Sequence, residues 1–119
     1  MLEMRSTIRL QSSAKVKLQE IADKECILKD LSITGCKIEC SFSKEIIPNK
    51  QFTLQIVPER ASEVAPFIIV SESKWVNPGE KNCEVGFSIV ESPKGKQFQR
   101  YVEYLSWRSS QGISITGTA

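Results

Sequence analysis

The sequence predicts an all-β protein, a six-stranded antiparallel barrel with one C-terminal α-helix. Most of the chain consists of short segments in which apolar and polar residues alternate, a pattern typical of antiparallel strands with one buried face. About six such segments are separated by polar, glycine or proline residues, and closing them into a barrel would remove the exposed strand edges. After residue 92 the apolar residues instead recur with helical spacing.

The strand candidates share apolar side chains at about every second position. In chain order they cover residues 14–19, 25–29, 36–40, 52–56, 67–76 and 83–90. Ser92-Pro93 then suits the start of a helix, as an N-cap followed by proline at the first helical position. The apolar residues that recur at i, i+3, i+4 and i+7 are Phe98, Tyr101, Val102 and Leu105. This spacing predicts an amphipathic helix over residues 93–108 that lies against the barrel or plugs one end.

The remaining segments complete a single domain over residues 1–108, because 119 residues suffice for one compact core but not for two ordinary ones. We expect a flexible start over residues 1–13 and the barrel over residues 14–91. Residues 109–119 are rich in Ser, Gly and Thr and lack a helical stripe, which indicates a mobile tail. Ile113 and Ile115 alternatively suit a late edge strand.

The composition argues against most enzyme classes. The chain has no histidine, which removes Ser-His and Cys-His nucleophile pairs, histidine metal sites and the usual proton shuttle. No other set of base, nucleophile and metal ligands can be assembled from the sequence, so we predict a binding protein without catalysis. The net charge of +2 is too small to predict broad affinity for nucleic acid through neutralised phosphates.

The cellular compartment, and with it the redox state of the cysteines, is predicted from the lack of a signal peptide and of a membrane-spanning stretch. The N-terminus lacks an apolar run fit for a signal peptide, and no stretch approaches the roughly 18 apolar residues of a membrane span. We therefore expect a cytoplasmic protein with no membrane insertion, in which the four cysteines stay reduced. Cys36 and Cys40 alternate with polar residues as small buried hydrophobes do, and the chain has no C-x-x-C pair. We expect no metal site.

Two motifs suit a ligand that is both anionic and aromatic. Arg5 and Arg9 form an R-x-x-x-R motif, and arginines at this spacing share a side, so two guanidiniums can donate to phosphates and stack on bases. Asp30, Ser32 and Gly35 form a D-x-S-x-x-G motif between two strand candidates.

In this second motif, the Asp30 carboxylate can accept from the N–H edge of a guanine, and Ser32 can donate to an oxygen or cap its own turn. Gly35 permits positive φ and close approach of the backbone to a ligand. The alternative interpretations are two solvated arginines on a disordered N-terminus, and a hairpin turn with glycine in the left-handed conformation.

With these motifs the sequence resembles the PilZ domain family, the bacterial receptor modules for cyclic di-GMP (cyclic diguanylate), over roughly residues 4–106. The resemblance also includes Ser73-Lys74-Trp75-Val76, Glu84-Val85-Gly86-Phe87 and the closing helix. It implies a PilZ-type, Greek-key-like six-stranded barrel with a C-terminal helix.

The resemblance also implies roles for the motif residues. Arg5 and Arg9 would grip the phosphates and guanine faces of cyclic di-GMP, while Asp30, Ser32 and Gly35 would form the barrel-surface half of the site. Met4 stands where the family often has another basic residue, which favours one ligand molecule per protein.

The function implied is that of a stand-alone cytoplasmic receptor for cyclic di-GMP, with no other cofactor. Its N-terminal segment would become ordered over the ligand and change contacts with an unidentified effector protein, in motility or biofilm regulation. We expect a monomer without a nucleic-acid partner. The alternatives are a PilZ-like adaptor that binds protein rather than nucleotide, and a small barrel that binds single-stranded nucleic acid.

Two further features each allow two interpretations. Trp75 could stack on guanine, but a tryptophan in an apolar strand is more often part of the core. A basic set on the predicted helix could dock an acidic partner, but a solvated face is the favoured interpretation. This set consists of Lys94, Lys96, Arg100 and Arg108.

Overall fold

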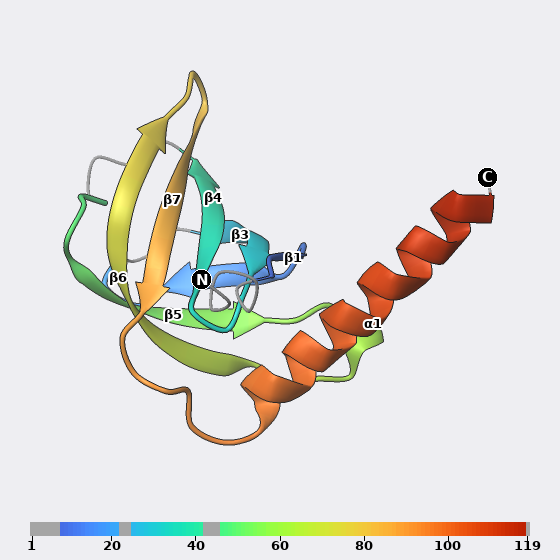
Figure 1. Ribbon diagram of the computed structural model, residues 1–119. Helices are drawn as coiled ribbons and strands as arrows, with labels where there is room; N and C mark the ends of the chain where they lie inside the picture. Colours follow the sequence, from blue (N-terminus) through green and yellow to red (C-terminus); the bar gives the residue numbers. More distant parts are fainter. Residues whose placement is uncertain (1–7, 22–24, 42–45, 119) are drawn as a thin grey trace, which may run out of the picture.

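The computed structural model of this protein describes residues 8–21, 25–41 and 46–118, with the backbone alone described from residue 112 on. The elements in chain order are β1 (Leu10–Gln11), β2 (Lys15–Leu18), β3 (Glu25–Leu31), β4 (Gly35–Ser41), β5 (Gln51–Val57), the 3₁₀ helix η2 (Arg60–Ser62), β6 (Phe67–Pro78), β7 (Asn82–Ile89) and α1 (Gln97–Thr118). Strands β2 to β7 close into a six-stranded antiparallel barrel, as the sequence predicts, and β1 is an additional strand outside that ring (Figure 1).

The order of strands around the barrel differs from their order in the chain. Strands β5, β6 and β7 are neighbours, β7 pairs with β4, β4 with β3, β3 with β2, and β2 with β5, which closes the ring. The chain therefore crosses from β4 to β5 without pairing the two. All six segments with alternating residues are strands, because one side of each can face a common interior while the other side meets water.

The barrel interior is filled by the apolar residues of this alternation. Every strand of the ring contributes at least one side chain that is fully buried, and these include Val16, Leu28, Ile38, Leu54, Ile69 and Val85. Phe52 and Phe87 meet edge to face inside the barrel, with ring centroids 5.9 Å apart. The interior is thus a packed core and offers no channel among these side chains.

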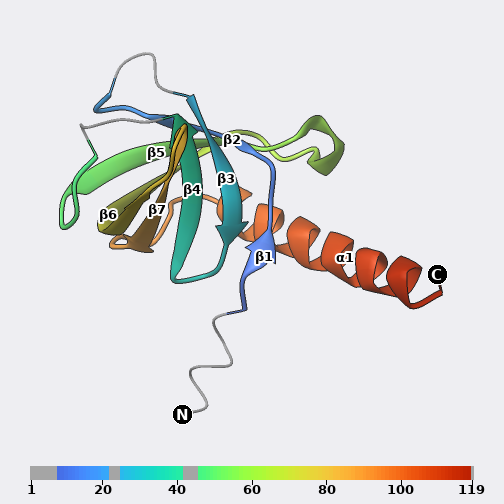
Figure 2. The ribbon, with the colours of Figure 1, turned by 90° about the horizontal axis from the view of Figure 1, so that it is seen from above.

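Helix α1 packs its first half on the barrel and projects its second half beyond it (Figures 1 and 2). The predicted apolar stripe makes this contact, since Tyr101 and Leu105 are buried and Phe98 and Val102 are partly buried against the core. The Phe98 ring lies edge to face on Phe67, with centroids 6.0 Å apart. The amphipathic helix predicted from the sequence is therefore confirmed, although its bounds differ.

The helix begins and ends later than residues 93 and 108. Gly95 has a φ of 81°, which an α-helix does not tolerate, so the first turn forms only after it. The helix then continues to Thr118, in place of the tail or late edge strand that residues 109–119 indicate. Extending an existing helix adds a hydrogen bond per residue without the cost of a new nucleus.

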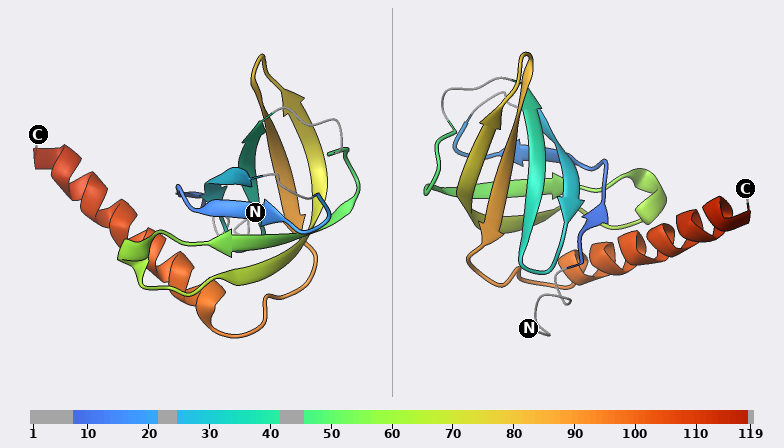
Figure 3. Two further views of the ribbon diagram at one scale, coloured as in Figure 1. Left: turned by 180° about the vertical axis from the view of Figure 1, so that it is seen from behind. Right: turned by 45° about the horizontal axis from the view of Figure 1, so that its top comes forward.

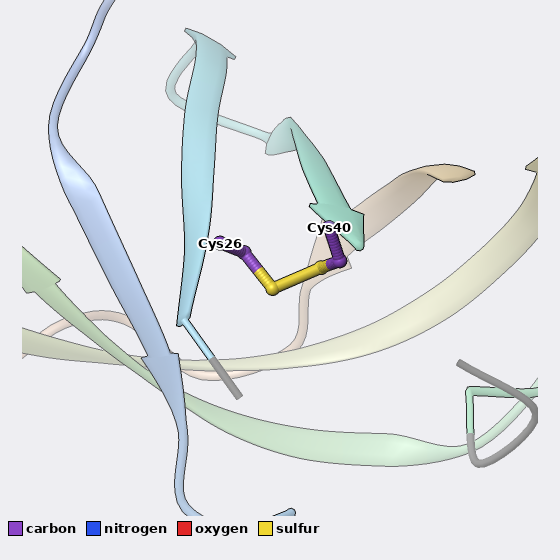
Figure 4. The surroundings of a disulfide bond; sticks show 2 residues. All are labelled: Cys26 and Cys40. Atoms are coloured by element: carbon purple, nitrogen blue, oxygen red, sulfur yellow. A yellow bond between two sulfur atoms is a disulfide. The ribbon is translucent and has the colours of Figure 1, made fainter. Parts of the chain in front are cut away.

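The expectation that all cysteines are reduced is wrong, because Cys26 and Cys40 form a disulfide (Figure 4). The two residues are direct partners in the β3–β4 ladder, with Cα atoms 4.4 Å apart, within the range that a disulfide requires. Cys36 and Cys83 are free and buried. Burial, and after it the nearby Asp30 carboxylate, raises the pKa of the Cys36 thiol to about 12, so this thiol stays neutral and serves as a small core residue.

Within the described residues, no helix combines the length and the apolar character needed to cross a membrane.

Opening the Cys26–Cys40 disulfide should lower the stability of the barrel. The cross-link spans 14 residues. A loop of about this size lowers the entropy of the unfolded chain and thereby stabilises the folded state by about 3 kcal/mol. Urea unfolding with and without reductant measures the difference. Cys26→Ser/Cys40→Ser is the control, because its midpoint should not respond to reductant. Equal midpoints for the wild type in both conditions would contradict the prediction, as would a third reactive thiol in the unfolded, unreduced chain besides Cys36 and Cys83.

Candidate functional site

Two β-bulges turn candidate site residues to the outside of the barrel. In β3 the register with β4 shifts between Leu28 and Asp30, so Lys29 and Asp30 both lie outside the core between two buried leucines. In β6 the register with β7 shifts between Ser73 and Trp75, so that Trp75 also faces outward. A bulge adds one residue to a strand and thereby changes the face on which the following side chain lies. Asp30 and Trp75 thus reach the same outer surface.

The strand register places these residues in one row across four strands of the barrel and β1. Gln11 of β1 pairs with Asp30, and Asp30 pairs with Lys37 of β4. Lys37 pairs with Gly86 of β7, and Gly86 pairs with Trp75 of β6. Neighbouring strands lie about 4.8 Å apart, so the three spacings from β3 to β6 separate Asp30 and Trp75 by roughly 14 Å across the sheet.

The two sequence motifs meet at an ion pair. Arg9 donates from Nη1 to the Asp30 Oδ1 atom at 2.7 Å, and the Lys37 ammonium lies 3.8 Å from Oδ2 of the same carboxylate. The Asp30 side chain is only 13% exposed, whereas that of Arg9 is 55% exposed. The structure therefore brings together the second arginine of R-x-x-x-R and the first residue of D-x-S-x-x-G. Arg5 lies outside the described residues.

Ser32 builds the turn that joins β3 to β4. Its side chain is 2% exposed, and its hydroxyl accepts from the backbone N–H groups of Thr34 and Gly35, each at 3.2 Å. The Ser32 N–H also donates to the Gly35 carbonyl at 2.8 Å. Of the two uses foreseen for this hydroxyl, the structure shows the cap of its own turn. Ser32 fixes the loop beside Asp30.

Gly35 is required by its neighbours in the sheet. A Cβ built on Gly35 would overlap the carbonyl oxygen of Phe87 in β7. Among the described glycines only Gly95 has positive φ, so the interpretation that Gly35 adopts the left-handed conformation is wrong. Gly35 instead lets β4 and β7 approach closely next to the Ser32 turn. Both small residues of the motif thus hold the position from which Asp30 faces outward.

Trp75 lies on the outside of the barrel, so its interpretation as a core residue is wrong. The side chain is 43% exposed, and a Cβ on Gly86 would overlap the indole ring, so the indole covers the glycine that pairs with it. The bulge at Lys74 produces this orientation. Because the Trp75 ring lies over Gly86 of β7, and Gly86 pairs with Lys37 of β4, the ring is next to the strand that carries Lys37. It remains partly accessible.

A small polar pocket opens beside the ion pair. It has a volume of about 240 Å³ and is lined by Gln11, Ser12, Lys29, Asp30 and Lys37. Lys29 has a partner of its own, the Glu39 carboxylate 3.6 Å away. Together with Arg9, the cations at this pocket outnumber the carboxylates, which favours an anionic ligand.

Sequence reasoning missed the four pocket residues besides Asp30. The two lysines flank D-x-S-x-x-G at short distance in the sequence and carry the charge of the pocket, so charge near the motif is a signal that could have found them. Gln11 and Ser12 had no such signal, because β1 is too short for its alternation to be read.

A partly buried carboxylate, that of Glu59, joins two side chains of helix α1. Tyr101 donates its hydroxyl proton to Oε1 of Glu59 at 2.6 Å, and Arg108 donates to Oε2 at 2.5 Å. Burial alone would raise the pKa of Glu59, but the hydrogen bond from Tyr101 and the charge and hydrogen bond of Arg108 hold it below its usual value. Burial and the same hydrogen bond to Glu59 raise the pKa of Tyr101, so the phenol stays neutral. Arg108 is therefore an internal partner and not part of a solvated basic face.

No protein-family model, curated protein or solved structure matches this chain. The case for a function therefore depends on the site itself. Among the residues that the structure describes, no group of His, Cys, Asp and Glu side chains is arranged to hold a metal ion.

Alanine substitutions at the two sheet glycines, Gly35 and Gly86, should reduce the stability by different amounts, because one methyl would meet rigid backbone and the other a movable side chain. In Gly35→Ala the new methyl meets backbone of β7, and overpacking of this kind costs about 1–3 kcal/mol. In Gly86→Ala it meets the Trp75 ring, which can rotate into solvent, so the loss of stability should be smaller and the indole emission should change. Urea unfolding and fluorescence in a Trp107→Phe background test this. Equal losses of stability in the two variants, with unchanged indole emission in Gly86→Ala, would contradict the position of the Trp75 ring over Gly86.

The Glu59 interactions should contribute a pH-dependent part of the stability. Because the folded pKa of Glu59 lies below the ordinary 4.5, the stabilisation is present above that pH and disappears as the pH falls through the folded value. The difference in melting temperature between wild type and Glu59→Gln should therefore shrink below about pH 4.5. Glu103→Gln, on the exposed side of α1, is the control. A difference that stays constant down to the acid limit of folding would refute the prediction.

Proposed function

We propose that this protein is a receptor for cyclic di-GMP of the PilZ type, without catalytic activity. The observation that carries the proposal is the contact at 2.7 Å between Arg9 and Asp30, because it joins the two motifs from which the resemblance was drawn. The closed six-stranded barrel with a C-terminal helix agrees with the fold that the resemblance implies.

The ion pair is suited to exchange with a nucleotide. Arg9 is the exposed partner of the pair, at 55% exposure, so its guanidinium can turn toward a ligand while Lys37 stays beside the largely buried Asp30 carboxylate. The Arg9 guanidinium has donors in addition to the one directed at Asp30, and these can reach a phosphate while its flat face stacks on a base. Asp30 can then accept from the N–H edge of guanine, with Lys37 balancing its charge.

Ser32 and Gly35 take an indirect part in this proposal. The Ser32 hydroxyl is engaged in its own turn, and Gly35 allows the close approach of β7. Both residues therefore support binding by holding the hairpin on which Asp30 lies. Trp75 lies farther along the same row, and in this proposal it would stack on the second guanine of the ligand.

The size of the pocket favours a site that is completed by the N-terminal segment. At about 240 Å³ the pocket is smaller than the roughly 300–1,000 Å³ of sites that enclose drug-sized ligands. It can take one base or one phosphate of cyclic di-GMP, and the rest of the ligand would lie outside it. The segment that carries Arg5 would cover this remainder, with one ligand molecule per protein.

The proposed output is a change of surface. When the segment around Arg5 and Arg9 folds over the ligand, the charge and shape beside the β3–β4 hairpin change, and an effector protein in motility or biofilm regulation would respond. The proposal keeps the cytoplasmic location and no cofactor besides the ligand. In a reducing compartment the Cys26–Cys40 disulfide is protected only by burial, since these cysteines are 1% and 2% exposed.

Calorimetric titration with cyclic di-GMP at two salt concentrations tests the proposal. The wild type should bind saturably, and Arg9→Ala should bind at least about tenfold more weakly, since hydrogen bonds to charged groups contribute about 1.5–3 kcal/mol. Arg100→Ala removes an exposed arginine of α1 and should bind like the wild type. The linear guanine dinucleotide should bind much less well.

Three outcomes would reject the receptor. Absence of heat and of a melting shift near millimolar ligand would favour the protein-binding adaptor. Binding that falls steeply with salt and does not distinguish cyclic from linear nucleotide would favour a single-stranded nucleic-acid binder. Equal affinity of Arg9→Ala and wild type would show that the motif pair is not the site.

A further inference from the structure

Strand β1 is too short to hold its own position. It pairs with β3 through only two residues, Leu10 opposite Leu31 and Gln11 opposite Asp30. Yet β1 carries the pocket residue Gln11, Ser12 of the pocket follows it directly, and Arg9 directly precedes it. Figures 2 and 3 show β1 between the barrel and helix α1. The position of Arg9 relative to Asp30 therefore depends on what fixes β1 from the other side.

The side chains that fix β1 come from helix α1. The Ser12 hydroxyl donates to the Tyr101 hydroxyl at 2.7 Å and accepts from the Ala14 N–H at 3.0 Å. Arg108 donates from Nη2 to the Gln11 carbonyl at 2.8 Å. The two contacts with α1 join pocket-lining residues of the N-terminal segment to residues 89 and 97 positions later in the chain.

Glu59 holds the two helix residues in the required geometry. Its carboxylate accepts from Tyr101 through one oxygen and from Arg108 through the other. The Tyr101 ring is buried against Phe67, and the Arg108 guanidinium lies over the Tyr104 ring, 5.5 Å from its centre. The Tyr101 oxygen that accepts from Ser12 and the Arg108 guanidinium that donates to Gln11 are thus oriented before β1 meets them, which lowers the entropic cost of forming these contacts.

We propose that Glu59, Tyr101 and Arg108 form a clamp whose task is to position β1, so that Arg9 and Asp30 meet at the nucleotide site. The three are positioning residues and do not touch the ligand. The ligand part of this inference rests on the proposed function, whereas the positioning of β1 does not. By linkage, the factor by which the clamp strengthens ligand binding equals the factor by which ligand strengthens the docking of β1 on α1.

The first arm of the test needs no ligand. The Ser12 N–H donates to the Lys29 carbonyl at 3.0 Å only while β1 is docked, so its hydrogen exchange reports the clamp. In Tyr101→Phe, which keeps the ring but loses the hydroxyl, and in Arg108→Ala, exchange at Ser12 should be about five- to tenfold faster. Amides inside the barrel, such as that of Ile38, should be unchanged and show that the variants fold. Arg100→Ala is the matched control.

The second arm titrates cyclic di-GMP. Both clamp variants should bind at least about fivefold more weakly than wild type and Arg100→Ala, at equal barrel protection. Arg108→Lys should recover part of the loss, because an ammonium can reach Glu59 but cannot also hold the Gln11 carbonyl in a fixed fork.

The two arms separate the possible failures. Unchanged exchange at Ser12 in both variants overturns the clamp, whether or not ligand binds. Faster exchange with unchanged affinity, in a wild type that binds, overturns its role in the site. A wild type that binds no cyclic di-GMP overturns the proposed function and the ligand part of the inference, while the exchange result still decides whether the clamp positions β1.

Discussion

The candidate site depends on one extra residue in β3. With strict alternation after the buried Leu28, Asp30 would point into the barrel and Leu31 into water. The bulge reverses both, so Leu31 is buried and Asp30 faces Arg9, Lys37 and the pocket. Burying an unpaired carboxylate would cost far more than the unpaired backbone groups of a bulge, which is why the irregularity is maintained. Ser32 and Gly35 then fix the hairpin immediately after it.

The sequence predicted the strands and the apolar face of α1 because both follow from periodicity, which depends on local spacing alone. It could not predict Cys26 opposite Cys40, because the register of two strands is set by the whole barrel. The prediction that Trp75 is a core residue failed because the bulge beside it interrupts the alternation on which such a prediction depends. The contact of Arg9 with Asp30 agrees with the paired motifs, whereas Lys37 became part of the site only through pairing across strands.

The charges around Asp30 explain why such a site can be stable without ligand. The carboxylate is largely buried, and a buried carboxylate needs partners. Arg9, which precedes β1, and Lys37 of β4 are these partners. An anion that enters the pocket can draw on Arg9 while Lys37 remains beside Asp30, so the carboxylate is never left unpaired. This redistribution allows a local change at β1 without disturbing the core below it.

The energetics of helix α1 decide which side of the contact between α1 and β1 can move. Tyr101 and Leu105 are 0% and 1% exposed, and exposing such side chains costs roughly 1.5–3 kcal/mol each. Coupling between two sites is typically about 1–3 kcal/mol, which is less than the cost of undocking both. A ligand coupled to the helix with this free energy would therefore not release it. Strand β1 is held by two residue pairs and the clamp, so it is the element whose docking a ligand can shift, and α1 is the fixed support against which that shift occurs.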